Sequence, residues 1–420
     1  MHMPGAAADA AILTPEQAAV LAWRNLAPQR WPLPLEAFPP EAALVGGAVR
    51  DALLNRLGPS PDLDLVVAGD AISLCRQLGR RHGGSVVVLD ADRSIARLVI
   101  AGWSIDLARM EGSDLHTDLR RRDYTVNAMA LPLAAPDKLE DQLGGLAHLQ
   151  QKMMVAVCEQ NLLDDPLRLL RGVRLGSELG FGLSTATENW IRQHHQSLEQ
   201  VASERVLAEI EKLVAAVDGE QGLITCLQLG LLDPWRADHA VDAVEQLERC
   251  STEGSKQLGL TAEEQQQALP LARLAACLDG TGLRKLHSSR RLQQRVARLR
   301  HWQGQLGRNS NLSPKQAENL SEADRLRLQR DLEEDLPALL LNWPLKSAVP
   351  WLARWRDPGD LLFHPKAAIN GVTLQEALGL KASPKLGKLL EHLMLEQAFG
   401  RVHNKEETLL AAQTWLESAH

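Results

Sequence analysis

The stretch Leu44-Val-Gly-Gly-Ala-Val-Arg-Asp51, followed after a short loop by Asp62-Leu-Asp64, decides the fold of this chain. Two glycines stand where a short apolar strand, residues 43–45, turns into a helix expected from about Val49 to Leu57. Glycines at such a turn let backbone N–H groups approach a phosphate, and the start of the helix adds partial positive charge. Such a turn alone is more often structural than functional, so it needs a second signal.

The second signal is the pair Asp62 and Asp64, which flank the first residue of an expected strand, Leu63–Val67. Since side chains alternate along a strand, both carboxylates project from one face. Two like charges held side by side are unfavourable unless a cation neutralises them, and hard oxygen ligands suit Mg²⁺. A lone Asp-x-Asp is usually a surface pair, but the glycine turn just upstream favours a two-metal site for phosphoryl transfer.

Composition limits the class of protein. A length of 420 residues predicts two to four domains, and a net charge of −7 means that nucleic acid can be bound only by a local basic surface. The five cysteines are scattered and odd in number, which fits neither a disulfide framework nor a zinc cluster. No apolar run approaches the roughly 20 residues that span a bilayer, and no signal peptide is recognisable. We expect a cytoplasmic protein with no membrane partner.

The motif Gly46-Gly-Ala-Val-Arg-Asp51 with Asp62-Leu-Asp-Leu-Val-Val67 resembles the head of class II tRNA nucleotidyltransferases. That family contains CCA-adding enzymes and bacterial poly(A) polymerases, and the resemblance implies a DNA-polymerase-β-like nucleotidyltransferase head. It implies triphosphate contacts for Gly47 and Arg50, and catalytic magnesium ligation for Asp62 and Asp64. Asp106 is a candidate third carboxylate, although a structural role is favoured there.

A second motif, Arg121-Arg-Asp-Tyr-Thr-Val-Asn-Ala-Met-Ala130, matches the RRD(F/L)T(I/V)NA pattern of the same family. The resemblance implies that Arg122 contacts the phosphate or sugar of the nucleotide. We expect Thr125 and Asn127 to order the turn. Tyr124, the single tyrosine of the chain, is expected to pack rather than to stack on a base.

A third motif, Asp164-Asp-Pro-Leu-Arg-Leu-Leu-Arg-Gly-Val-Arg174, matches the family pattern (E/D)DPLRLLRxxR. Asp165 before a proline is a typical helix start, and Arg168, Arg171 and Arg174 then share one helix face with it. Surface salt-bridge stripes look similar, but aligned arginines make sense if they face an anion. We assign Arg171 and Arg174 to the phosphate charge that develops during transfer.

The resemblance implies that Asp165 and Arg168 pair with the incoming base. A carboxylate accepts and a guanidinium donates, which suits cytosine and adenine and opposes uracil. The pair therefore predicts CTP and ATP over UTP, without a nucleic-acid template.

The connection between Arg109-Met-Glu111 and Arg121 is short, spanning only residues 112–120. CCA-adding relatives carry a longer flexible loop there, a lever that re-orients the base-reading pair between cytosine and adenine. The short connection resembles the CC-adding branch, which adds two cytidines and leaves the adenosine to a separate A-adding enzyme. We predict CC addition to tRNA from CTP; full CCA addition with CTP and ATP is the main alternative, and a poly(A) polymerase or A-adding enzyme is less favoured.

A basic stretch without acidic residues lies between Asp279 and Glu318 and is the candidate for contact with the tRNA backbone. A solvated helix face is the alternative. Its cations are Arg284, Lys285, Arg290, Arg291, Arg295, Arg298, Arg300, Arg308 and Lys315.

The predicted fold class is α+β, because strand signals fade after about residue 141. The predicted parts are a variable N-terminal extension (1–40, with one helix at Pro15–Leu26), the catalytic head (41–140), an all-helical neck that reads the base (141–215), and a helical body and tail that bind tRNA (216–420). A non-enzymatic RNA-binding relative would be expected to lack the carboxylates, and an HD phosphohydrolase would need a His-Asp dipeptide that the sequence lacks.

Overall fold

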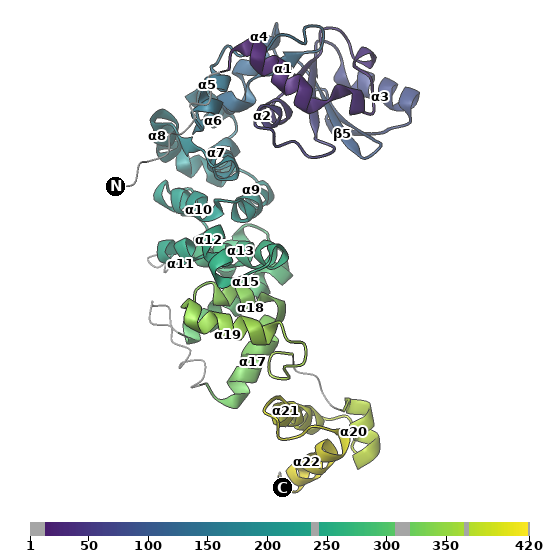
Figure 1. The fold of residues 1–420 in the computed structure, drawn as a ribbon, viewed down its shortest axis with the longest axis vertical. Coiled ribbons are helices and arrows are strands. Elements are labelled where there is room, and N and C mark those ends of the chain that lie inside the picture. Colours follow the sequence, from purple (N-terminus) through teal and green to yellow (C-terminus); the bar gives the residue numbers. More distant parts are fainter. Residues whose placement is uncertain (1–12, 237–242, 307–319, 365–368, 419–420) are drawn as a thin grey trace, which may run out of the picture. The chain divides into compact units, whose positions relative to one another are not determined.

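The computed structural model describes residues 13–236, 243–306, 320–364 and 369–418. The chain divides into two compact units, residues 1–201 and 202–420. The first unit contains both strands and helices, and the described elements of the second unit are all helices (Figure 1). The α+β class expected from the sequence is confirmed.

A six-stranded sheet forms the centre of the first unit, in the order β3-β4-β5-β2-β1-β6. Strands β2 and β5 are parallel, and the other neighbours are antiparallel. The strands are β1 (Ala43–Val45), β2 (Leu63–Val67), β3 (Ser85–Asp90), β4 (Ile95–Ile100), β5 (Trp103–Arg109) and β6 (Ala130–Pro132).

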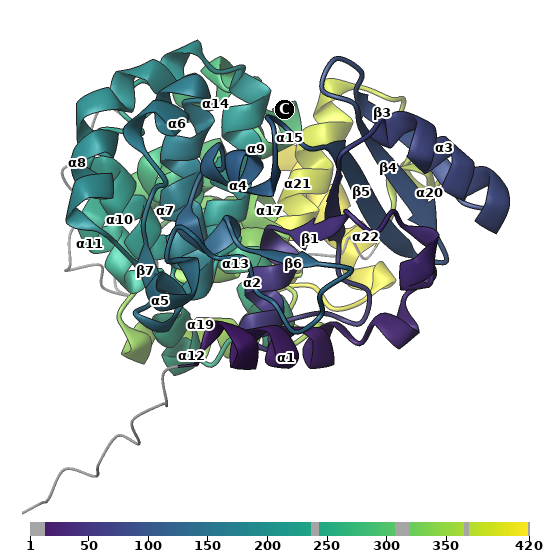
Figure 2. The ribbon, with the colours of Figure 1, turned by 90° about the horizontal axis from the view of Figure 1, so that it is seen from above.

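The two faces of this sheet differ in character. Helix α3 (Ala71–His82) packs along β3, β4 and β5 on one face, where Leu98 and Ile105 are buried (Figure 2). The alternate residues project from the other face, which carries Arg97 beside Asp106. The sheet therefore separates an apolar face under α3 from a polar face that is free for chemistry.

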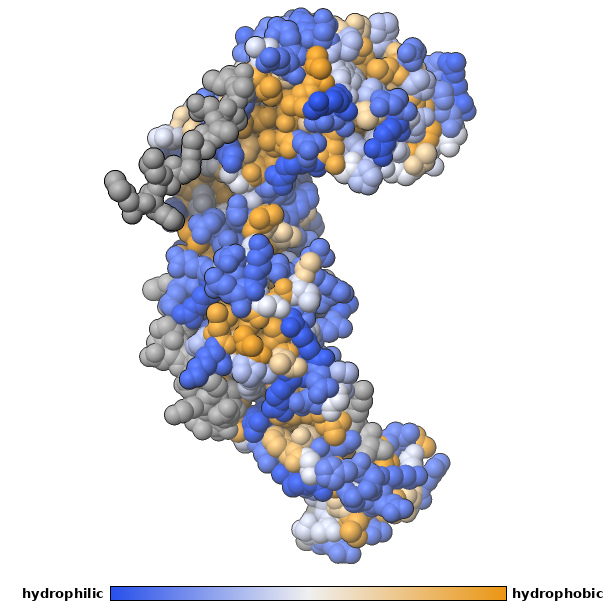
Figure 3. Space-filling model, in the orientation of Figure 1, coloured by the Kyte–Doolittle hydropathy of each residue, from blue (hydrophilic) through white to orange (hydrophobic). Residues whose placement is uncertain are grey.

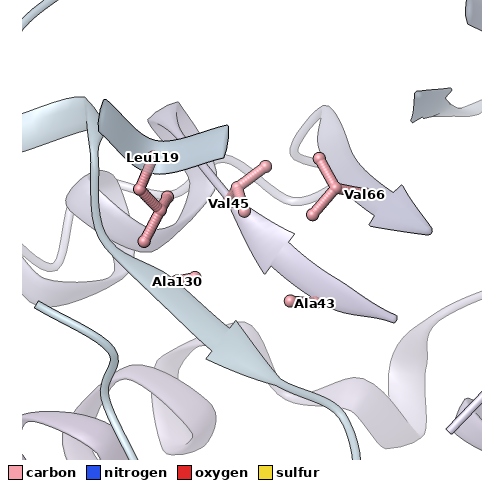
Figure 4. Close-up of a cluster of buried hydrophobic side chains, with 5 residues drawn as sticks. All are labelled: Ala43, Val45, Val66, Leu119 and Ala130. Carbon is pink, nitrogen blue, oxygen red and sulfur yellow. The ribbon is translucent and has the colours of Figure 1, made fainter. Parts of the chain in front are cut away.

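Helix α4 (Leu115–Arg120) covers the end of the polar face over β1, β2 and β6. Its Leu119, 2% exposed, meets side chains of these three strands in a small apolar cluster (Figure 4). The other members of the cluster are Ala43, Val45, Val66 and Ala130. The short connection predicted from the sequence is thus a docked helix, held by buried apolar side chains.

Residues 13–40 pack within the first unit. Helix α1 (Pro15–Leu26), with the bounds expected from the sequence, packs on α2 (Gly47–Leu53), and the Asn25 side chain donates to the Ala52 carbonyl at 2.8 Å. Two short 3₁₀ turns follow, η1 (Pro28–Arg30) and η2 (Leu35–Ala37).

Helix α2 ends earlier than the sequence suggested. It stops at Leu53 instead of Leu57 because Asn55 takes a left-handed conformation with φ of 53°. Asparagine tolerates this region better than most residues, so it ends helices readily.

The remainder of the first unit is mostly helical. It contains η3 (Thr125–Asn127), α5 (Gly145–Gln150), α6 (Glu159–Asp164), α7 (Leu167–Leu179), α8 (Thr185–His194) and η4 (His195–Gln200). A short parallel pair, β7 (Met153–Met154) with β8 (Gly182–Leu183), interrupts the helices. The expectation of an all-helical segment after residue 141 is wrong at this point, because strands of two residues leave no alternating pattern to read.

The second unit is built from packed helices around apolar cores. They are α9 (Ser203–Ala215), α10 (Gly219–Gln228), α11 (Ala243–Arg249), α12 (Thr252–Leu258), α13 (Ala262–Cys277), α14 (Gly280–Lys285), α15 (Arg290–Gln305), α17 (Glu322–Leu332), η6 (Glu333–Asp335), α18 (Leu336–Leu340), α19 (Leu345–Trp355), α20 (Gly371–Leu378), α21 (Pro384–Ala398) and α22 (Lys405–Ser418).

Helix α13 lies at the centre of the larger core. Its Arg273, 1% exposed, donates to the Val214, Ala216 and Cys250 carbonyls and pairs with the buried carboxylate of Glu220. One side chain thus joins α9, α10, α13 and the end of α11. A separate apolar cluster joins α20, α21 and α22.

Hydrophilic side chains cover most of the visible face of the second unit, with apolar residues in small groups (Figure 3). Among the described residues, no helix combines the length and the apolar composition that crossing a bilayer requires.

Candidate active site

The glycine turn lies directly beside a carboxylate and an arginine. Gly46 has φ of 74° and ψ of −136°, a conformation that side chains with a Cβ rarely adopt. A Cβ placed there would lie 3.4 Å from both the Arg122 guanidinium and the Asp64 carboxylate. Motifs that are distant in sequence therefore meet at one point.

Asp64 is the half-buried member of the carboxylate pair, and its register neighbours on the sheet are Val45 on one side and Asp106 on the other. Its pKa is raised to about 6, chiefly because burial disfavours the charged form and next because Asp106 lies close. Arg122 and Arg171 act in the opposite direction, while Asp62 adds to the rise. The raised pKa of Asp64 thus reflects burial first and the neighbouring carboxylates second.

Asp106 lies on the same face but has its own partner. Both of its carboxylate oxygens accept hydrogen bonds from Arg97, at 2.7 and 2.9 Å. Among the described residues, no three acidic, histidine or cysteine side chains form a ready-made metal site. Asp62 and Asp64 therefore fit a cation that takes one or two carboxylates and keeps waters or substrate oxygens as its other ligands, as Mg²⁺ does.

Arg122 is held in place by the docked helix α4. Its guanidinium donates to Asp118 at 3.1 Å, and the other oxygen of Asp118 accepts the Glu111 N–H at 3.0 Å. The Nε of Arg122 is buried without a hydrogen-bond partner among the described residues. A buried donor of this kind calls for an acceptor, and a nucleotide phosphate supplies one.

Arg50 is engaged in the protein interior. It is 9% exposed, it chelates Asp51 through two hydrogen bonds of 2.8 and 2.9 Å, and it donates to the Asn127 side chain at 2.6 Å. The structure thus gives Arg50 a bracing role behind the turn, and its contact with triphosphate stays a prediction. Gly47, the next residue of the turn, has the Arg50 guanidinium as its close neighbour.

The base-reading candidates lie at the start of α7. Asp165 is extended, with φ of −142°, and its carboxylate faces the Leu167 N–H at 3.4 Å. Arg168 donates to the Arg121 and Asn161 carbonyls at 3.1 and 2.9 Å. The pair is therefore positioned beside the Arg-Arg-Asp motif.

The other two arginines of α7 have carboxylate partners. Arg171 pairs with Asp123 at 2.7 Å and still acts on the charge of Asp64. Arg174 is buried and pairs with Glu178 at 2.6 Å, one turn along the same helix. This gives Arg174 a structural partner, and its predicted contact with phosphate has no support from the geometry.

Three site residues, Asp118, Asp123 and Asn161, were not predicted from the sequence. Asp118 and Arg122 are four residues apart, a spacing that signals an ion pair on a helix. Asp123 lies within a recognised motif, yet nothing local predicts its pairing with Arg171. Asn161, whose amide donates to the Arg120 and Arg122 carbonyls at 2.7 Å, has no sequence signal at all.

Tyr124, Thr125 and Asn127 are packed as predicted. Tyr124 is buried and its hydroxyl donates to the Arg168 carbonyl at 2.8 Å. Thr125 bonds to His148 at 2.9 Å, and Asn127 bonds to Arg50.

Within the basic stretch of the second unit, several cations serve the fold. Arg295 pairs with Asp335 at 2.6 Å, and Arg300 donates to the Ala275 carbonyl at 2.6 Å. Lys285 donates to the Pro234 carbonyl, and Arg284 to Thr281. Arg290, Arg291 and Arg298 of α15 are exposed, as are Arg284 and Lys285 of α14, and Arg298 also reaches the Asp331 carbonyl at 3.5 Å. Arg308 and Lys315 lie outside the described residues.

Transfer of a nucleotide needs charge held against phosphate oxygens and carboxylates that place a metal, and the polar face of the sheet offers both. The first unit contains a nucleotidyltransferase head. The poly(A) polymerase head-domain family model matches residues 42–155, and the model described as a probable RNA and SrmB-binding site of polymerase A matches residues 180–250.

Whole-length relatives agree with this class. The chain is 34% identical over 403 residues to the CC-adding tRNA nucleotidyltransferase of Synechocystis, covering 92% of this chain and 96% of the relative. It is 30% identical to the A-adding tRNA nucleotidyltransferase of Deinococcus radiodurans, covering 91% and 98%. The chain belongs to the class II tRNA nucleotidyltransferase family.

The fold is also that of a solved relative. The Thermotoga maritima CCA-adding enzyme, determined in complex with tRNA, superposes with a TM-score of 0.68 at 22% identity, covering 89% of this chain and 91% of that one.

Proposed function

We propose that this enzyme adds two cytidines to the 3′ end of tRNA, using CTP and no template, and that a separate A-adding enzyme completes the end. The observation that carries the proposal is the docked helix α4. Its Leu119 is buried in the sheet cluster and its Asp118 binds both the Glu111 backbone and Arg122. Residues 115–120, most of the connection, are then docked as a helix and are not free to act as a lever between cytosine and adenine. The CC-adding name of the Synechocystis relative supports the same choice.

We assign the nucleotide to the polar face of the sheet beside the glycine turn and Asp64. The backbone N–H groups at Gly46 and Gly47, with Arg122, receive the triphosphate, and Arg171 lies on the same side as Asp64. Asp165 and Arg168 select the base by accepting from and donating to its Watson–Crick edge.

Asp62 and Asp64 hold Mg²⁺ in this proposal. When bound there, Mg²⁺ would supply a lower pKa for the 3′-hydroxyl and neutralisation of charge on the phosphates. The tRNA backbone lies along the exposed arginines of α15. A cytoplasmic location suits five cysteines that are all free thiols.

The test offers purified protein a tRNA without its CCA end, with CTP alone, ATP alone, and both, resolved at single-nucleotide length. Growth by two residues that ATP does not extend is the expected result. Growth by three residues with both nucleotides, or addition of AMP to a tRNA ending in CC, would overturn the assignment.

A variant pair tests the site itself. Asp62→Ala should abolish addition and leave tRNA binding intact, because the carboxylate acts on the reacting atoms and not on the RNA duplex. Asp137→Ala removes an exposed carboxylate outside the site and should leave the rate unchanged. Turnover by Asp62→Ala above a few per cent of the unsubstituted rate would contradict the metal assignment.

A further inference from the structure

A continuous chain of polar contacts runs from the glycine turn to the base-reading helix. Arg50, on α2, donates to the Asn127 side-chain oxygen at 2.6 Å. The amide nitrogen of Asn127 donates to Asp123 at 3.2 Å, and Asp123 pairs with Arg171 of α7 at 2.7 Å. Arg50, Asn127, Asp123 and Arg171 are called the polar relay below.

The middle of the relay requires a side chain that both accepts and donates a hydrogen bond. Asn127 and Asp123 are 5% and 8% exposed, so their polar atoms depend on one another. Burial alone would raise the pKa of Asp123, but Arg171, the Tyr124 N–H and Asn127 outweigh burial and hold the pKa below its ordinary value. Only a side chain that accepts on one side and donates on the other can join a guanidinium to this carboxylate, and an amide does both.

Residues next to the relay also contact α7 directly. The Tyr124 hydroxyl bonds to the Arg168 carbonyl at 2.8 Å, and the Tyr124 ring lies against Gly172, where a Cβ would come within 1.8 Å of the hydroxyl. Arg168 itself donates to the Arg121 carbonyl at 3.1 Å. The start of α7 therefore follows the position of residues 121–127, and Asn127 fixes that segment to α2.

We propose that Asn127 and Asp123 are positioning residues that set base choice by holding Asp165 and Arg168 at a fixed place relative to the phosphate turn. The inference rests on the proposed function, since it assumes that those two residues read the base. Both positioning residues are bonded to protein side chains, with Arg50 on one side and Arg171 on the other, and act on the bound nucleotide through them. The phosphate held at Gly46 and the base held by α7 belong to the same nucleotide, so a shift of α7 relative to Gly46 misplaces the nucleotide. A misplacement of about 1 Å costs up to about 100-fold in rate.

The first test compares two substitutions in the same 3₁₀ turn. Asn127→Ala cuts the relay, whereas Thr125→Val removes a part-buried hydrogen bond to His148 that leads away from it. With CTP and UTP offered separately, Asn127→Ala should lower the ratio of their kcat/KM values by roughly tenfold or more, and Thr125→Val by less than about twofold. An unchanged ratio for Asn127→Ala, or an equal fall in both variants, would overturn the proposal.

Asn127→Asp tests whether the hydrogen bond that Asn127 donates matters, or only the shape of its side chain. It preserves the volume and still accepts from Arg50, but it cannot donate to Asp123 and sets two carboxylates side by side. The relay predicts that its nucleotide discrimination falls as far as in Asn127→Ala. Discrimination equal to that of the unsubstituted protein would show that only the shape of the side chain matters.

The two ends of the relay provide a second test. Arg50 and Arg171 are linked through Asn127 and Asp123, so the relay predicts that their effects are coupled. Arg50→Met and Arg171→Met should each lower the ratio of kcat/KM for CTP to that for UTP. In the double variant, the fold-loss of this ratio should be smaller than the product of the two single fold-losses by about threefold or more. Effects that simply multiply would refute the coupling.

Failure of the proposed function is visible separately. If the unsubstituted protein adds no cytidine, that function is wrong, and the relay is then judged by hydrogen exchange of the α7 amides at residues 169–173. Asn127→Ala should increase their exchange at least about tenfold, and Thr125→Val should leave it unchanged. Equal protection of the α7 amides from exchange in both variants would refute the relay.

Discussion

Replacing Asp64 by asparagine should stabilise the metal-free protein while abolishing nucleotide addition. The folded state raises the pKa of this carboxyl from 3.8 to about 6, so the ionised form is held less favourably in the folded protein than in the unfolded chain. That difference corresponds to roughly 3 kcal/mol at about 1.4 kcal/mol per pKa unit. A neutral side chain of the same shape removes the penalty, and roughly 3 kcal/mol is the upper limit of the gain.

The sign of the pH dependence follows from proton linkage. Ionised Asp64 destabilises the fold, and the effect is absent below pH 3.8, grows between 3.8 and about 6, and is complete above that. Asp64→Asn and the unsubstituted protein should therefore unfold alike near pH 4, and the variant should be the more stable protein at pH 7.5.

The assay is chemical denaturation in EDTA at both pH values. Asp62→Asn is the matched control, because Asp62 is exposed and its replacement should change stability by less than about 0.5 kcal/mol while removing activity just as fully. If Asp64→Asn proves no more stable than Asp62→Asn at pH 7.5, the account of a buried and crowded carboxylate is wrong.

Three further substitutions test the packing that supports the site. Gly46→Ala should cost about 1–2 kcal/mol and weaken CTP binding at least about tenfold, measured by calorimetry, because φ of 74° strains an alanine; unchanged binding would contradict the tight turn. Gly172→Ala should destabilise the first unit by at least about 2 kcal/mol in urea, since the new methyl meets Tyr124, and a fully stable variant would disprove that contact. Arg273→Ala should cost about 3–5 kcal/mol because Glu220 is left buried without its partner, whereas a loss under 1 kcal/mol would show that water replaces the arginine.

Much of the fold was readable from local patterns. Apolar runs bounded by turns mark β1 and β2, and a threonine followed by a proline marks the start of α1, whose Thr14 side chain accepts from the Gln17 N–H. These elements are decided by residues adjacent in the chain. The pair β7 and β8 was not readable, because it is made by partners some thirty residues apart with only two residues on each strand.

The site was readable only in part. Gly46, Asp64 and Arg122 belong to motifs whose chemistry is recognisable, and the structure brings them to one point. Arg50 and Arg174 carry the same charge in the sequence as Arg122, yet they are turned inward to Asn127 and Glu178. Whether an arginine faces a ligand or a neighbour depends on burial and on partners far along the chain, which spacing does not reveal.

The sequence by itself determined the family, the two carboxylates and the shortness of the connection after Glu111, because each is a matter of residue type at close spacing. The tertiary structure alone decided that this connection is a docked helix, that Arg97 holds Asp106, and that Asn127 links Arg50 behind the glycine turn to Asp123 and α7. Those features depend on side chains that become neighbours only when the sheet has formed, and their energies arise from burial that the linear chain does not possess.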